Sequence, residues 1–169
     1  GCELHEALRK KPHVKLDHWQ RSPNWQTFNY AKPLIMHPDK APQELSRLDK
    51  KNWGHLPREI EARLLDSIKQ LAPRVHAFIL LEQVDHPDTG VLTPAVLEAF
   101  RNVLRQHPEK LIIADSRRGL RHFPPATYKM NAVELATLLG VNHKPDIDQA
   151  REHAVQLAQK NHQRVFITM

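Results

Sequence analysis

The chain of 169 residues contains little cysteine, glycine or aromatic side chain. Its one cysteine excludes an internal disulfide bond, and the lack of a Cys-x-x-Cys pair argues against a thiolate zinc site. Its five glycines fall below the usual share of about 7%, and no glycine-rich phosphate loop of the Walker type is present. Aromatic residues make up only 6% of the chain, which disfavours a stacking surface for nucleic acid.

Long apolar runs and a secretory leader are also missing. No apolar segment approaches the length of a membrane-spanning helix, and no charged stretch followed by an apolar one opens the chain. We therefore expect a cytoplasmic protein without a membrane partner. Both ends read as truncated, because the first residues fall directly into a helix-like pattern and the run 164–169 reads as a buried strand. The sequence is thus expected to be the middle portion of a longer protein.

Basic residues exceed acidic ones by 25 to 19, which gives a formal net charge of +6. This excess favours anionic partners in general. The basic residues are scattered and form no stripe, so a nucleic-acid-binding protein is the less favoured interpretation. The twelve histidines form neither His-x-His nor His-Glu-x-x-His, and scattered histidine is a better explanation for them than a metal site.

Strand-like and helix-like patterns alternate over about 57–169. The predicted strands are 75–81, 110–115, 126–130 and 164–169, and the predicted helices start at Pro57, after Thr93, at Ala132 and at Ile147. The run 75–81 is almost continuously apolar, as in a parallel sheet that is buried on both faces. We therefore predict the α/β class, with a largely parallel sheet between two helical layers, joined by right-handed crossovers.

Residues 27–49 precede this core and predict a small appended β lid. Phe28 and Tyr30 alternate as in a half-buried strand, and Pro33 places its continuation 34–36 at a sheet edge. The run 44–49 is predicted as a second strand that pairs with the first. An irregular surface excursion is the alternative interpretation.

Polar residues follow three of the predicted core strands. Gln83 and Asp85 follow the first strand, Arg117 follows the second, and Lys129 lies near the end of the third, just before the helix that opens with Asn131-x-x-Glu134. The carboxyl ends of parallel strands meet at one edge of a sheet, where such residues bind phosphate. Five of these six residues have a simpler explanation: Asn131 and Glu134 form a capping box, Arg117 is solvated, and Gln83 and Asp85 are turn residues.

Four segments together resemble the ribokinase-like (PfkB) carbohydrate kinases, especially the branch of the heptose-7-phosphate kinases. They are Thr-Gly-Val-Leu-Thr-Pro (89–94), Leu-Ile-Ile-Ala-Asp-Ser-Arg (111–117), Tyr-Lys-Met-Asn-Ala-Val-Glu-Leu (128–135) and Arg-Val-Phe-Ile-Thr (164–168). Residues 27–49, which end in Arg47-Leu48-Asp49, fit the lid strands of that family. The resemblance implies a three-layer ribokinase-like fold, transfer of the γ-phosphate of ATP to a sugar or sugar-phosphate hydroxyl with Mg²⁺, and a homodimer formed through the lid.

The resemblance also implies a role for each residue at the strand ends. Asn131 and Glu134 would organise Mg²⁺, water and phosphate, with Glu134 acting on the metal through water. Arg117 and Lys129 would neutralise the phosphoryl charge. Gln83 and Asp85 would lie near the sugar.

Three departures from the family pattern qualify these roles. Met130 replaces the proline that usually precedes the asparagine, and 85–90 replaces the glycine-rich substrate loop. The Gly-x-Gly-Asp motif, whose aspartate is the catalytic base of the family, is absent. The base is therefore expected outside this sequence and the chain is expected to be inactive alone. The alternative is a catalytically inactive nucleotide- or sugar-binding module of the same fold.

Overall fold

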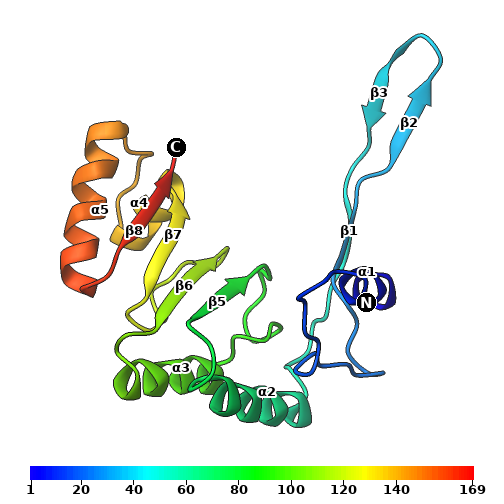
Figure 1. Ribbon diagram of the computed structural model, residues 1–169. Helices are drawn as coiled ribbons and strands as arrows, with labels where there is room; N and C mark the ends of the chain where they lie inside the picture. The colour runs from blue at the N-terminus through cyan, green and yellow to red at the C-terminus, as the bar shows by residue number, and fades with distance from the viewer.

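A computed structural model describes all residues, 1–169, and has the α/β architecture predicted from the sequence (Figure 1). In chain order the elements are α1 (Cys2–Arg9), β1 (Asn29–Ala31), β2 (Leu34–His37), β3 (Lys40–Glu44), β4 (Leu48–Lys50), α2 (Arg58–Leu71), β5 (Ala77–Glu82), α3 (Pro94–Gln106), β6 (Leu111–Ser116), β7 (Thr127–Asn131), α4 (Ala132–Leu139), α5 (Ile147–Asn161) and β8 (Val165–Thr168). No helix among them combines the length and the apolar content needed to cross a membrane.

The main sheet has four strands in the order β5-β6-β7-β8, and every neighbouring pair is parallel. The register aligns Leu80 of β5 with Ala114 of β6, and Ala114 with Tyr128 of β7. These three residues are buried. They belong to one hydrophobic cluster, to which α3 contributes Phe100 and α5 contributes Leu157. The predicted α/β class with a parallel sheet is therefore confirmed.

The same cluster shows that helices cover one face of this sheet. The strands follow one another across the sheet in chain order. Because connections between parallel strands are right-handed, connections that all step in the same direction lie on the same side of the sheet. The other face carries Ile79, Leu81 and Phe166, which are 75%, 52% and 55% exposed. The prediction that 75–81 is buried on both faces is therefore wrong, because only alternate residues of β5 point into the core.

Local capping signals position the helices that follow the strands. Thr93 accepts a hydrogen bond from the backbone N–H of Val96 at 3.3 Å, and Pro94 occupies the first turn of α3, as predicted. Asn131 and Asp146 each form a capping box, at α4 and α5 respectively. Helix α4 ends at Gly140, whose φ of 74° is a conformation that glycine adopts without steric cost.

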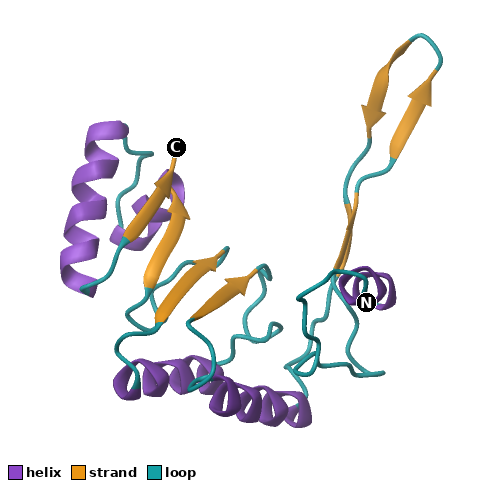
Figure 2. Cartoon of the chain, in the orientation of Figure 1, coloured by secondary structure: helices purple, strands orange, loops and turns teal.

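Residues 29–50 form an antiparallel ribbon in two parts, β1 with β4 and β2 with β3. The ribbon extends away from the main sheet (Figures 1 and 2). The predicted pairing of the run 44–49 with the first strand is confirmed, but this run is not one strand, because β3 ends at Glu44 and β4 begins only at Leu48. Pro42 lies inside β3, where it is tolerated because both strands of a two-stranded ribbon are edges. The strand residues of the ribbon are exposed, so it has no core of its own.

Candidate functional site

The candidate site lies at the carboxyl edge of the sheet, where β5, β6 and β7 end side by side. Register pairs the last residue of β5, Glu82, with the last residue of β6, Ser116, so the residues after them are also neighbours. The side chain of Arg117 donates from Nε to Oε1 of Gln83 at 3.0 Å. The structure thus brings together two of the residues that the sequence placed at different strand ends.

The last residue of β5, Glu82, is a buried carboxylate that the sequence analysis did not identify. Glu82 is 6% exposed and accepts hydrogen bonds from Oγ of Ser116 at 2.5 Å and from Nη1 of Arg118 at 3.3 Å. The backbone N–H of Arg118 in turn donates to Oγ of Ser116 at 3.1 Å. A buried carboxylate is tolerated only when it is paired and hydrogen-bonded. This network therefore fixes the backbone from which Arg117 projects.

Lys129 is near the same edge, on the sheet face that the helices leave uncovered. Its Nζ lies 2.9 Å from Oδ2 of Asp115, the neighbouring residue on β6. The hydrogen bond from Lys129 to Asp115 raises the pKa of the Lys129 ammonium above its ordinary value, so this group stays charged. Of the two predicted phosphate-binding cations, Lys129 is therefore paired with a carboxylate of the chain. Arg117 has no acidic hydrogen-bond partner.

Asn131 and Glu134 form the capping box that was the simpler of the two sequence explanations. Oδ1 of Asn131 accepts from the N–H of Glu134 at 2.9 Å, and Oε2 of Glu134 accepts from the N–H of Asn131 at 2.7 Å. No group of three or more His, Cys, Asp or Glu side chains is arranged to hold a metal ion. One carboxylate beside a phosphate still suits Mg²⁺, which keeps several waters and takes its other ligands from phosphate oxygens.

Asp85 is bound by a residue that the sequence did not single out. Nζ of Lys51 contacts Oδ2 and Oδ1 of Asp85 at 2.8 and 3.1 Å, and it also lies 3.6 Å from Asp49. Tyr30 donates from its hydroxyl to the backbone oxygen of Gln83 at 3.1 Å. These contacts attach the base of the ribbon to the end of β5. No sequence pattern reveals them, because they join residues 34 and 53 positions apart.

The contact with Lys51 leads to a testable prediction for the pKa of Asp85. The hydrogen bond from Lys51 is the main cause that lowers the pKa of Asp85 below its ordinary 3.8, and the charge of Arg117 adds to it. Because the folded pKa is the lower one, the stabilising effect of this pair is complete above pH 3.8 and is lost as pH falls through the folded value. We expect Lys51→Met to raise the pKa of Asp85 in an NMR titration of its carboxyl carbon. Lys50→Met, at an adjacent residue, should leave this pKa unchanged, and an equal rise in both variants would contradict the pairing.

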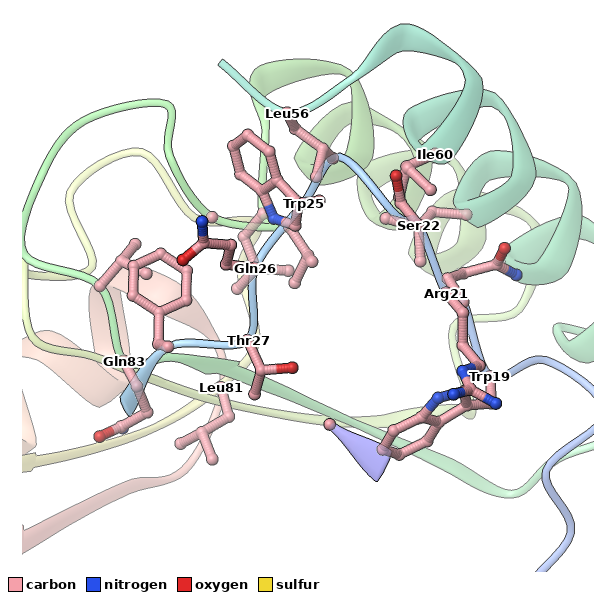
Figure 3. A pocket seen from close by; sticks show the side chains of 18 of the residues that line it. Trp19, Arg21, Ser22, Trp25, Gln26, Thr27, Leu56, Ile60, Leu81 and Gln83 are labelled. Atoms are coloured by element: carbon pink, nitrogen blue, oxygen red, sulfur yellow. The ribbon is translucent and has the colours of Figure 1, made fainter. Parts of the chain in front are cut away.

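The two predicted sugar-binding residues differ in their surroundings. Gln83 lies on the wall of a cavity of about 540 Å³ between the end of β5 and residues 19–28 (Figure 3). Asp85 is not on this wall and is occupied by Lys51. The structure therefore brings Gln83 to Arg117, Lys129 to Asp115 and Asn131 to Glu134, while it directs Asp85 toward the ribbon.

Comparison with protein-family models, with curated proteins and with solved structures gave no match.

Proposed function

We propose that the chain contains the phosphate-binding edge of an ATP-dependent carbohydrate kinase of the ribokinase-like type. The reaction would transfer the γ-phosphate of ATP to a hydroxyl group of a sugar or sugar phosphate. One observation carries this proposal: Arg117 directly follows β6, the middle strand of three parallel neighbours, with Gln83 hydrogen-bonded to it on one side and the start of α4 on the other.

Phosphoryl transfer depends mainly on positioning and on charge stabilisation, and the edge has groups for both. The guanidinium of Arg117 presents a planar set of donors that matches phosphate oxygens. Lys129 remains protonated and adds a second positive charge, which Asp115 partly balances. The first backbone N–H groups of α4 favour an anion at this end of the helix.

Glu134 would hold Mg²⁺ through water, and Asn131 would fix the carboxylate of Glu134 through the capping box. When bound, MgATP supplies the phosphoryl group and neutralises part of the phosphate charge. Gln83 and Asp85 would contact the hydroxyl groups of the acceptor. For Asp85 this requires that one of its oxygens is shared between Lys51 and the acceptor.

A three-layer fold is part of this proposal. In that arrangement helices would also cover the sheet face that carries Ile79, Leu81 and Phe166. The support for it is the large exposed fraction of these apolar side chains, of which Ile79 and Leu81 are neighbours on one face of β5, because exposed apolar surface on a soluble protein commonly marks a contact region.

The second candidate function is a nucleotide- or sugar-binding module of the same fold without catalysis. The internal pairing of Lys129 with Asp115, and of Asp85 with Lys51, favours it, because these charges are then already balanced. Measuring ADP formation by the intact protein, which is expected to include the catalytic base, over a panel of sugars and sugar phosphates separates the candidates. Binding of MgATP and sugar with ADP formation supports the kinase, and binding without it supports the module.

Asn131 offers a test that separates binding from stability. Asn131→Ala should lower the free energy of unfolding by about 0.5–2 kcal/mol, the usual effect of losing a helix cap. It should also weaken MgATP binding, measured by calorimetry, because the carboxylate of Glu134 loses its support. Asp146→Ala removes the same type of cap from α5 and serves as the matched control. If both variants lose stability and neither changes MgATP affinity, Asn131 is a helix cap only.

The proposal includes a homodimer formed through the ribbon. Leu34, Met36 and Leu48 of the ribbon strands are 52%, 71% and 64% exposed, which is costly unless another surface covers them. We expect sedimentation equilibrium to show a dimer that Met36→Asp converts to monomer. A monomer in the unmodified chain would contradict this part of the proposal.

A further inference from the structure

Beside the carboxyl edge lies the cavity of about 540 Å³ whose wall includes Gln83. It forms between the irregular segment 19–28, the start of α2 and the turn after β5 (Figure 3). Figure 3 shows the labelled side chains arranged around an open space, with Trp19 and Trp25 on different sides of it. Eleven of its 20 lining residues are hydrophobic, so its chemistry differs from that of the charged edge.

Contacts across the sequence hold the walls of this cavity in place. The ring of His5 on α1 meets the indole of Trp19 edge-on, with centroids 5.8 Å apart. The backbone N–H of Gln26 donates to Asn52 at 3.2 Å, and the amide of Asn52 donates to the backbone oxygen of Gln26 at 2.7 Å. These contacts therefore hold the irregular segment 19–28 in place at Trp19 and next to Trp25. A cavity with fixed walls requires little reorganisation to accept a ligand.

The interior of the cavity is apolar and aromatic. Leu56 and Ile60, which are 7% and 4% exposed, form its floor, and the half-buried rings of Trp19, Trp25 and Phe28 line its sides. Aromatic side chains favour flat ring systems through stacking and edge-to-face contacts. A bare sugar phosphate would instead leave its hydroxyl groups without partners on most of this surface.

Arg21 is the one cationic side chain that lines this apolar cavity. Arg21 donates from Nη2 to the thiol of Cys2 at 3.2 Å and takes part in no ion pair. A thiol is a weak acceptor, and the guanidinium group binds carboxylate or sulfonate far better. The only acidic residue of the lining is Glu82, whose carboxylate is held by Ser116 and Arg118. The cavity thus combines aromatic walls with an available positive charge.

We propose that this cavity binds a small, flat aromatic anion, with the ring system between the tryptophans and the acidic group on Arg21. The site adjoins the phosphate-binding edge at Gln83, and its binding of an aromatic anion does not depend on the proposed kinase activity. Its volume lies within the range of about 300–1,000 Å³ that is typical of small-molecule sites.

The probe for this site is 8-anilino-1-naphthalenesulfonate, titrated into the unmodified chain while the three indole N–H signals are followed by NMR. Trp53 is 71% exposed and does not line the cavity, so it is an internal control. We expect the signals of Trp19 and Trp25 to shift with one saturating isotherm and that of Trp53 to stay in place. Shifts confined to Trp53, equal shifts in all three signals, or no shift at all would overturn the proposal.

A second arm tests the role of the charge. Arg21→Met should weaken binding of the sulfonate probe about threefold to tenfold, the effect expected for one partly exposed ionic contact. It should leave the affinity for the uncharged N-phenyl-1-naphthylamine unchanged. Arg63→Met, an exposed arginine of α2 outside the cavity, and Ile79→Ser, on the uncovered sheet face, should change neither affinity. Equal losses for both probes in Arg21→Met, or loss of binding in Ile79→Ser, would overturn the assignment.

Discussion

Replacing Leu135 by alanine should lower the free energy of unfolding by about 2–5 kcal/mol, because a fully buried leucine leaves a cavity behind. Leu135 is 0% exposed and belongs to the hydrophobic cluster that joins α4 to the sheet. The loss should appear as a lower midpoint in urea denaturation with an unchanged slope.

Val133 provides the control for this substitution on the same helix. It is 53% exposed, so Val133→Ala should change the stability by no more than about 0.5 kcal/mol. Similar losses from both variants would mean that α4 is not packed against the sheet as described. The position of Asn131 and Glu134 relative to the other strand ends would then also be in doubt.

Replacing Arg117 by alanine should weaken MgATP binding about 10- to 100-fold, because hydrogen bonds to charged groups are worth more than neutral ones. Among the proposed phosphate-binding side chains, Arg117 is the cation that forms no ion pair with a carboxylate of the chain, since its hydrogen-bond partner is the neutral amide of Gln83. Calorimetry with the unmodified chain and the variant measures the change directly.

Arg121 is the matched control, because it lies in the same loop between β6 and β7 and is exposed. Arg121→Ala removes the same charge and should change the affinity for MgATP only slightly. If the two variants weaken binding equally, the effect comes from the net charge of the chain and not from a site at the strand ends.

Local sequence signals predicted much of the architecture. Thr93 with Pro94, Asn131 with Glu134, and the run of periodic apolar residues in each helix act within a few positions of the chain, so their effect can be inferred without tertiary structure. The parallel sheet followed from the alternation of strands and helices.

Features that depend on distant partners were not predicted. The burial of Glu82 is understandable only when Ser116 and Arg118 stand beside it, and the Lys51–Asp85 pair requires the path of the ribbon. The apolar run 75–81 contains no information on strand order. It therefore did not reveal that Ile79 and Leu81 face away from the helices.

The candidate site could be predicted only in part, because some of its contacts also depend on residues that are distant in the sequence. A position at a strand end can be read from the sequence, and adjacency of β5 and β6 brings Gln83 to Arg117. The pairing of charges at this edge could not be predicted from the sequence. The Lys129–Asp115 pair depends on which strands are neighbours and on which face of the sheet each side chain lies.

We propose that the ends of β5, β6 and β7 together form one phosphate-binding edge. An NMR titration of the chain with MgATP, followed through the backbone amides, tests it most directly. We expect the largest shifts to occur together at Gln83, Arg117 and Asn131, with one common dissociation constant. Shifts that avoid these three residues, or that follow different constants at each, would contradict it.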